Sequence, residues 1–361
     1  MSTRIGIVGM PNAGKSSLFN ALTKAGAEAA NYPFTTIEPN VAVVPVRDER
    51  LEQVAQTVGA SEIVWDTVDF HDIAGLVAGA HEGEGLGNRF LANIRETDAI
   101  VHVVRAHGDE NVVHPEGSVD ALRDIETVET ELVLADLEQA ERRLERVTRQ
   151  ARGGERALIA EQAWLTQVVA ELQAGRPARG VPLPEEAPNA ARDLGSLTAK
   201  PVLFVANVDE GSEEIPAAIA AHAQAQGAGA VAVSSRIEAE LAELEDDDAA
   251  AMREELGVSE SGLARVVREA FALLQLIAFF TAGEAKPAQS WHLRQGLTAW
   301  HAAGEIHTDI QKGFVRAEVI GWRELVDAGG YAGARERGTL RLEGRDYTMS
   351  DGDVITVKFT P

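Results

Sequence analysis

A phosphate-binding loop near the N-terminus constrains the fold of this chain more than any other stretch. Residues 9–16 have the sequence GMPNAGKS, which matches the GxxxxGK[ST] pattern in full. The apolar run at 4–8 predicts a buried strand before the loop, and the apolar spacing over 17–22 predicts a helix after it. Gly9 and Gly14 would then lie at a strand-to-helix turn with positive φ, where peptide N–H groups cradle a phosphate.

Two side chains of this loop have expected roles of their own. Lys15 should reach the β- and γ-phosphates, and the hydroxyl of Ser16 should bind Mg²⁺. A glycine-rich turn with an incidental lysine is the alternative, and the flanking strand and helix disfavour it. The sequence therefore predicts a nucleotide-binding α/β domain.

Two downstream segments are typical of a nucleotide switch. The proline-bounded stretch 31–40 predicts a loop, in which Thr35 and Thr36 are candidates to place a hydroxyl on Mg²⁺. The strand 64–70 leads into a DxxG element, where Asp72 can hold a metal-bound water and the N–H of Gly75 can meet the γ-phosphate.

The residues after this element bear on turnover. Leu76 stands where many GTPases have a glutamine that orients the attacking water, so turnover should be slow or should depend on another group. Residues 79–87 contain several glycines and predict a second switch loop.

The segment 124–152 has apolar residues at three- and four-residue steps, which predicts a long amphipathic helix. Gly153 and Gly154 break it, and a second helix over 158–172 predicts an antiparallel hairpin. The first helix carries a basic cluster in an acidic chain. Both a solvated face and a partner-binding patch are compatible with that cluster. Its members are Arg142, Arg143, Arg146, Arg149 and Arg152.

The strand 201–206 is followed directly by the element expected to recognise the base, Asn207-Val208-Asp209-Glu210. A guanine-specific site would have N-K-x-D, and here Val208 replaces the lysine and Glu210 the aspartate. The guanine-selective pair is therefore absent in its expected form, while Asn207 could still pair with a purine N7 or 6-amino group. The strand and loop at 230–236 should close over the base.

Composition limits the remaining possibilities. The 361 residues carry a formal net charge of −24, which argues against broad nucleic-acid binding and requires any RNA contact to use a local basic patch. Absence of cysteine excludes disulfides and thiolate metal sites. We find neither a long apolar run nor a signal peptide, so we expect a cytoplasmic protein with no membrane partner. The stretch from Thr281 to Pro361 predicts a small docking domain of short strands.

Together these motifs resemble the YchF subfamily of Obg-like P-loop NTPases. The resemblance spans essentially the whole chain. It rests on the segments 9–16, 31–40, 72–77, 83–88, 207–210 and 304–309. Met10 and Ala13 differ from the leucine and valine that the family often has beside its Pro-Asn pair, and both changes keep an apolar residue.

The resemblance implies an α/β architecture of three parts. A P-loop NTPase domain over 1–123 and 199–276 would be interrupted by an antiparallel helical hairpin at 124–198. A ubiquitin-like β-grasp domain of the TGS type would follow at 277–361.

It also implies an activity and its site. The family prefers ATP over GTP, uses Mg²⁺ and associates with the ribosome, so we expect contact with its large subunit, and with RNA through the hairpin and the TGS domain. Ser16 and Thr36 would be Mg²⁺ ligands, Val208 a backbone contact to adenine, and His114 the catalytic residue. The phosphate cradle would comprise Asn12, Ala13, Gly14, Lys15, Ser16 and Ser17.

The expected function is a Mg²⁺-dependent, ATP-hydrolysing switch that meets a translation component. Three alternatives stay open at this point. The chain could be a GTPase of the Obg class, or a nucleotide-sensing module with negligible turnover, which Leu76 would permit. A metabolic phosphotransferase fits least well, because the switch-like loops and the DxxG element would have no role in it.

Overall fold

The computed structural model describes residues 3–27, 40–73, 86–108, 117–244, 246–258 and 260–360. These residues form two compact units. The phosphate-loop unit comprises Thr3–Val44 and Asp69–Leu273, and the C-terminal unit contains Pro45–Val68 and Leu274–Pro361. The sequence-based division assigns residues 45–68 to the NTPase domain, whereas in the structure they cluster with the C-terminal strands.

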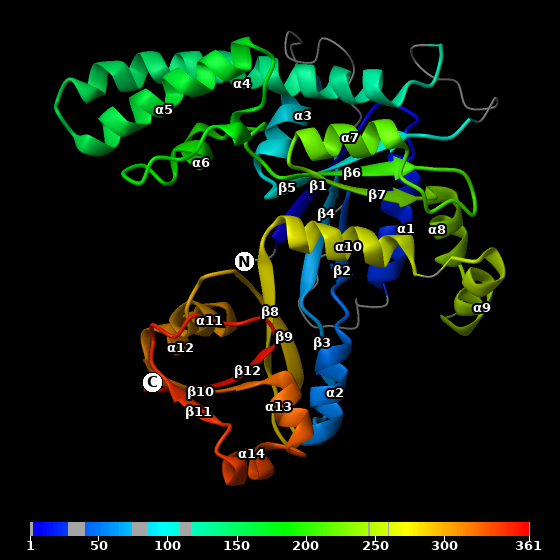
Figure 1. Ribbon diagram of the computed structural model, residues 1–361, viewed down its shortest axis with the longest axis vertical. Coiled ribbons are helices and arrows are strands. Elements are labelled where there is room, and N and C mark those ends of the chain that lie inside the picture. The colour runs from blue at the N-terminus through cyan, green and yellow to red at the C-terminus, as the bar shows by residue number, and fades with distance from the viewer. Residues whose placement is uncertain are drawn as a thin grey trace. The chain divides into compact units, whose positions relative to one another are not determined.

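The phosphate-loop unit is built on a six-stranded sheet with the order β2-β4-β1-β5-β6-β7 (Figure 1). The strands from β1 to β7 in this order run parallel, with Ile7 opposite Val101 and Val101 opposite Leu203. Every residue of β5 and β6 is buried, as expected for central parallel strands covered on both faces. The strands are β1 (Thr3–Val8), β2 (Val41–Pro45), β4 (Thr67–Asp72), β5 (Ala99–Arg105), β6 (Val202–Asn207) and β7 (Gly229–Val233).

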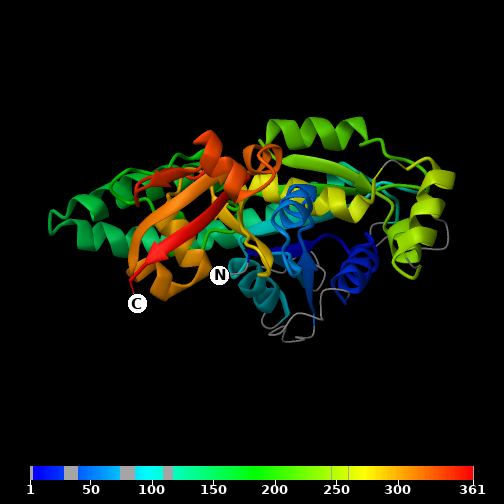
Figure 2. The same cartoon turned by 90° about the horizontal axis from the view of Figure 1, so that it is seen from below.

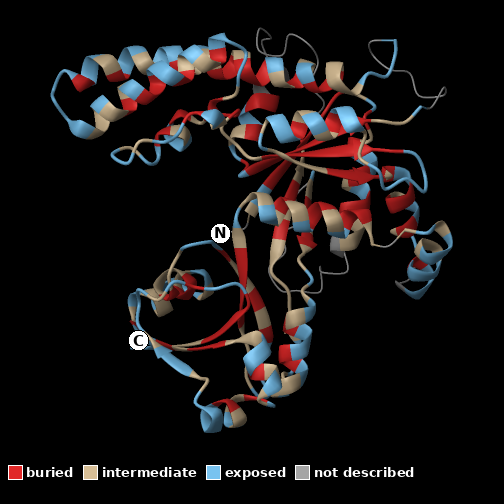
Figure 3. Cartoon of the chain, in the orientation of Figure 1, coloured by how far each residue is buried: buried red, intermediate tan, exposed pale blue. Residues whose placement is uncertain are grey.

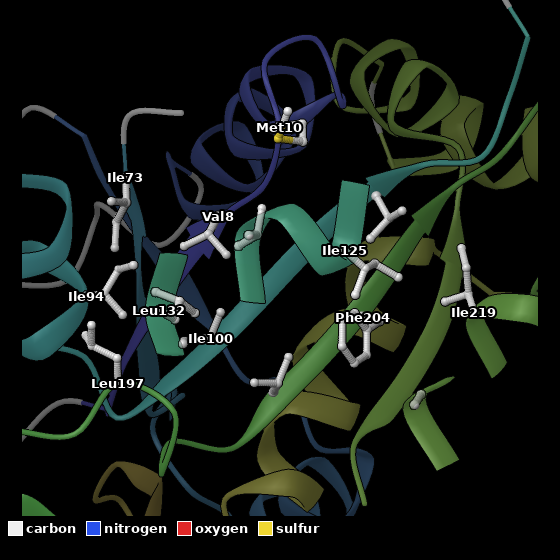
Figure 4. Packing of buried hydrophobic residues seen from close by; sticks show 14 of the residues in the cluster. Val8, Met10, Ile73, Ile94, Ile100, Ile125, Leu132, Leu197, Phe204 and Ile219 are labelled. Carbon is white, nitrogen blue, oxygen red and sulfur yellow. The ribbon is translucent and has the colours of Figure 1, made fainter. Parts of the chain in front are cut away.

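Helices cover both faces of this sheet. On one face, side chains of α3, α4 and α7 pack on β5 and β6 around Phe204, and Figure 4 shows this core from close by. The other face holds α1, α8 and α10, where α1 contacts α8, α10 and β1, and α10 contacts β6 and β7. The bounds are α1 (Lys15–Ala27), α3 (Leu86–Arg95), α4 (Ala121–Ala151), α7 (Ala217–Ala225), α8 (Ser235–Leu241), α9 (Asp246–Leu256) and α10 (Gly262–Leu273).

Two helices extend beyond the sheet, α4 and α5 (Arg156–Gln173), and they lie side by side in Figure 1 and Figure 2. The Asp120 carboxylate caps the first turn of α4, so the helix begins at Ala121, three residues before the expected start at residue 124. Trp164, Leu165 and Val168 of α5 are buried against α4. The return segment carries the short helices η2 (Ala178–Gly180) and α6 (Ala190–Leu194).

The C-terminal unit contains a second six-stranded sheet, with the order β11-β10-β12-β8-β9-β3. The two strand pairs β8–β9 and β10–β12 are antiparallel, and β12 runs parallel to β8. Its strands are β3 (Ile63–Val64), β8 (Leu276–Thr281), β9 (Ala288–Arg294), β10 (Phe314–Gly321), β11 (Arg341–Glu343) and β12 (Asp353–Phe359). Its helices are α2 (Glu49–Val58), α11 (Ala299–Ile306), α12 (Thr308–Lys312), α13 (Trp322–Asp327) and α14 (Tyr331–Arg337).

Helices also bury both faces of this second sheet. One face packs on α11, with Phe279 and Val319 in the core, and the other packs on α2 and α13 around Phe280. The buried residues of each unit form its interior in Figure 3. Among the helices that the structure describes, none is long and apolar enough to cross a membrane.

Candidate functional site

The phosphate loop occupies the turn between β1 and α1, as its sequence predicts. Gly9 has φ +150° and Gly14 has φ +101°, which confirms the expected positive values. A Cβ on Gly9 would lie against the carbonyl oxygen of Val103, so this position requires glycine for space as well as for conformation. Asn12 also has a positive φ of 62°, which asparagine tolerates better than most residues. The loop lies at the carboxyl edge of the parallel strands, where α/β sheets bind ligands.

Lys15 is buried in this loop, and its ammonium donates a hydrogen bond of 2.8 Å to the carbonyl oxygen of Met10. Burial lowers the pKa of Lys15, and attraction to the carboxylate of Asp72 partly opposes that shift. Burial likewise raises the pKa of Asp72, and the charge of Lys15 opposes it. An opposite charge nearby therefore stabilises the charged form of each group. A lysine beside phosphates and a carboxylate beside a metal ion would be stabilised in the same way.

The oxygen atoms at this edge suit a magnesium ion. Ser16 is exposed on the first turn of α1, and Asp72 ends β4 with a half-buried carboxylate. Hydroxyl and carboxylate oxygens are ligands that Mg²⁺ accepts together with water and phosphate oxygens. Ser16 and Asp72 are thus the described residues that could hold the ion. Thr36, Gly75 and His114, together with Thr35 and Leu76, lie outside the described residues.

Asn207 makes two buried contacts within the protein. It ends β6 and is 5% exposed, and its side-chain amide nitrogen donates a hydrogen bond of 3.0 Å to the carbonyl oxygen of Ala13. Its amide oxygen accepts a bond of 3.0 Å from the peptide N–H of Ser235. The side chain that we expected to read the base thus connects the phosphate loop to the loop after β7, because both loops leave the same edge of the sheet.

The neighbouring base-reading residues are placed very differently from each other. Val208 is 6% exposed, and its peptide N–H donates to Val233 at 3.0 Å, so its side chain belongs to the core. Glu210 is half-exposed and forms an ion pair of 3.1 Å with Arg236. A Val208→Lys exchange would therefore bury an ammonium group, and it is a poor test of base preference.

Two further histidines near the loop had no place in the sequence argument. The ring of His107 lies 3.4 Å from the amide nitrogen of Asn207, just after the end of β5. His102, on β5, is fully enclosed, and its ring packs 5.4 Å from that of Phe204. The pKa of His102 is lowered to about 3. Burial is the main cause, and the positive charges of Lys15 and His222 add to it. The sequence of β5 is a continuous apolar run around His102, and it does not indicate that this histidine is neutral.

The basic cluster on α4 separates into two kinds of side chain. Arg142 and Arg149 are about two-thirds exposed and pair within the helix with Glu138 and Glu145. Arg143 is only 22% exposed and binds Glu161 of α5 at 2.6 Å. Arg143 therefore holds the two helices together, and the remaining arginines are the ones available to a partner.

Comparison with known proteins gives family matches over two parts of the chain and relatives that align over 99% of it. Residues 4–143 match a family described as a 50S ribosome-binding GTPase, and residues 276–360 match the C-terminal domain of the YchF GTPases, described as a protein of unknown function. The ribosome-binding ATPase YchF of Bacillus subtilis is 45% identical over 99% of this chain and 100% of its own length. The Haemophilus influenzae protein of the same name is 48% identical over 99% of both chains.

A solved structure matches as well. The YchF GTPase of Schizosaccharomyces pombe superposes with a TM-score of 0.87 at 34% identity, covering 99% of this chain and 98% of that one. The names of these relatives differ in the nucleotide, since the bacterial proteins are called ATPases and the yeast protein a GTPase.

Proposed function

The chain belongs to the YchF family, and from that premise we propose that it is a Mg²⁺-dependent ATPase that associates with the ribosome in the cytoplasm. The observation that carries the proposal is the conformation of the phosphate loop, with Gly9 and Gly14 at positive φ and Lys15 buried behind them. A magnesium ion, when bound, would neutralise phosphate charge and orient the γ-phosphate. Ser16 and Asp72 would hold it, and Thr36 would complete the set. Residues 12–17 and the N–H of Gly75 would then surround the phosphates.

The preference for ATP rests on the base-reading element and on the names of the bacterial relatives. Val208 and Glu210 replace the lysine and aspartate of a guanine reader. Val208 would contact adenine through its backbone. Asn207 bonds Ala13 and Ser235, and the second lone pair of its amide oxygen would accept from the 6-amino group of adenine. We propose His114 as the residue that orients the attacking water, since Leu76 cannot do so.

Titration of ATP and GTP into the purified protein, followed by single-turnover hydrolysis, tests this proposal. We expect ATP to bind at least several-fold more tightly than GTP, and Lys15→Ala to abolish Mg²⁺-dependent turnover. Lys24→Ala is the matched control, because Lys24 is 40% exposed on the last turn of the same helix and pairs with Glu243. Tighter binding of GTP would favour the GTPase alternative, and binding without turnover would favour the nucleotide-sensing module.

The chain is acidic, so its association with ribosomal RNA requires a local basic patch on its surface. We propose that the α4–α5 pair, as the helical hairpin, and the C-terminal residues 277–361, as a TGS domain with a β-grasp sheet, contact the large subunit and its RNA. The exposed arginines of α4 support this assignment, because they form the densest basic cluster in the sequence.

A paired charge reversal tests the hairpin surface. Arg142 and Arg149 changed together to glutamate should weaken cosedimentation with ribosomes and flatten its salt dependence, since each lost phosphate contact lowers counterion release. Lys24 and Arg268 changed to glutamate form the control, because both are at least 40% exposed in the same unit, on the helices α1 and α10 that cover the other face of the sheet from α4, and the net charge changes equally. Equal losses in the two variants would show a general charge effect and would remove the hairpin from the proposal.

A further inference from the structure

The loop between β6 and α7, residues 208–216, follows directly on the buried Asn207 at the carboxyl edge of the sheet. We call it the base loop, because the base-reading residues 208 and 210 belong to it. The backbone holds its first residue, since the peptide N–H of Val208 donates to the carbonyl oxygen of Val233 at 3.0 Å. Within the described chain, residues 209–215 make no backbone hydrogen bond to another element. Side chains must therefore hold the rest of the loop.

Two ion pairs join the base loop to neighbouring helices. Glu210 pairs with Arg236 of α8 at 3.1 Å, and both side chains are exposed. Glu213 pairs with Arg265 of α10, whose side chain is only 18% exposed. Solvent screens an exposed pair and leaves it little net strength, whereas a partly buried bond between arginine and a carboxylate is stronger. The bond between Glu213 and Arg265 is therefore the main attachment of the base loop beyond Val208.

The guanidinium of Arg265 has a second contact, on β7. Its Nη2 donates to the carboxylate of Glu213, and its Nη1 donates to the carbonyl oxygen of Ala232 at 3.5 Å. One planar group thus bonds both the loop after β6 and the strand that leads into the loop at 234–236. The base should lie between these two loops. Because the nitrogens of a guanidinium are fixed relative to one another, Arg265 sets the distance from the base loop to the end of β7.

The helix that carries Arg265 is itself fixed to the sheet. Glu238 of α8 is buried, and its carboxylate accepts from the peptide N–H groups of Gly262 at 2.7 Å and Leu263 at 3.3 Å, at the start of α10. A Cβ on Gly262 would lie 2.9 Å from side-chain atoms of both Glu238 and Val233, so α10 approaches the end of β7 closely. The helix also contacts β6. Arg265 therefore projects from a helix that is packed and hydrogen-bonded beside the base loop.

We infer that Arg265 is a positioning residue for base specificity, because it holds the base loop where Glu210 can face the base. This inference rests on the proposed binding of ATP at this edge of the sheet. Glu210 stands at the position of the aspartate in a guanine reader and lies between the two attachments of the loop, at Val208 and at Glu213. Loss of Arg265 removes the second attachment and displaces Glu210. The phosphate contacts of residues 12–17 do not involve Arg265 and stay in place.

Titration of ATP and of GTP, each with Mg²⁺, into the full-length protein and its Arg265→Ala variant tests the inference. We expect the affinity for ATP to fall about tenfold and that for GTP less than about threefold, so the preference for ATP shrinks. Loss of folded protein or damage to the phosphate loop would weaken both nucleotides equally. Arg268→Ala is the control, because Arg268 lies on the same helix and pairs with Glu260 instead of the base loop. An unchanged ratio of the two affinities in Arg265→Ala would overturn the inference.

A double-mutant cycle assigns the effect to the ion pair. Glu213→Ala should weaken ATP binding by about the same factor as Arg265→Ala, and the double variant should bind ATP no more weakly than Arg265→Ala alone. Additive losses would show that the bond between the two side chains is not the cause, and would overturn the role of Arg265. A wild-type protein that binds ATP no more tightly than GTP would instead refute the proposed ATP preference, while the cycle measured with ATP alone would still decide whether Arg265 holds the base loop.

Discussion

The side-chain amide of Asn207 donates a hydrogen bond of 3.0 Å to the carbonyl oxygen of Ala13, across 194 residues of sequence. The same side chain accepts from the N–H of Ser235. Three loops at the carboxyl edge of the sheet therefore share one buried amide. The phosphate loop is held in place from the side on which the base would bind, so nucleotide affinity should depend on this contact in addition to any contact between Asn207 and the base.

Gly14→Ala should disrupt this contact. A Cβ at Gly14 would collide with the amide nitrogen of Asn207 and would lie 2.8 Å from the hydroxyl of Ser235, in addition to the strain of a φ of +101°. We expect nucleotide binding to be lost in a titration. Gly154→Ala carries comparable strain at a φ of +81° with no atom within 4 Å, so it separates the collision from the backbone effect. Equal nucleotide affinity in the two variants would refute the role assigned to this contact.

His102 should make the protein sensitive to acid. Its pKa is about 3 in the folded chain against 6.5 for the free group, so below pH 6.5 the unfolded chain binds a proton that the folded chain excludes. The free energy of unfolding should therefore fall as the pH falls, by about 2 kcal/mol between pH 7 and pH 5 from this group alone. Urea unfolding of His102→Leu should show a correspondingly smaller difference between the two pH values. An unchanged difference would mean that other groups cause the acid sensitivity.

The local parts of the site could be predicted from sequence, because a short motif determines them. Gly9 and Gly14 need positive φ for the phosphate turn, and the strand before them and the helix after them follow from apolar spacing. Asn207 could not be placed in this way, since its partners belong to other loops and only the sheet order brings them together. Both hydrogen bonds of Asn207 therefore depend on the order of the strands in the sheet.

The segment at residues 45–68 shows the same limit at the level of domains. The apolar residues Leu51, Val54 and Ala55 form the buried face of α2. Their spacing predicts that one face of the helix is buried, but it does not predict which sheet that face packs on. The segment lies between two strands of the first sheet, so chain order assigned it to that domain. Its burial against the β8–β12 sheet depends on residues more than 200 positions later.

Arg143→Ala should destabilise the α4–α5 pair. The guanidinium of Arg143 donates to Glu161 through two nitrogens at 2.7 and 2.6 Å, and the Glu161 side chain is only 10% exposed. Removing Arg143 leaves that carboxylate without its partner, and we expect a loss of about 1–3 kcal/mol in urea unfolding. Arg142→Ala should cost less than about 0.5 kcal/mol, because Arg142 and Glu138 are exposed. Similar losses in both would argue against a special role for the partly buried pair.

Asp136 of α4 binds the end of the return segment. It is 1% exposed, and its carboxylate accepts four hydrogen bonds of 2.7 to 2.9 Å. The donors are the hydroxyls of Ser196 and Thr198 and the peptide N–H groups of Leu197 and Thr198. Such a set needs an acceptor on both oxygens, and only the ionised aspartate provides it.

Asp136→Asn places an amide N–H₂ group against one of these donors, so we expect about 2–3 kcal/mol of destabilisation in urea unfolding. Amide exchange at Leu197 and Thr198 should become faster at the same time, because their acceptor is weakened. Glu138→Gln is the matched control on the same helix, since Glu138 is 63% exposed and pairs only with Arg142 among the ion pairs described. If Asp136→Asn unfolds like this control, the network around Asp136 does not hold the return segment on α4.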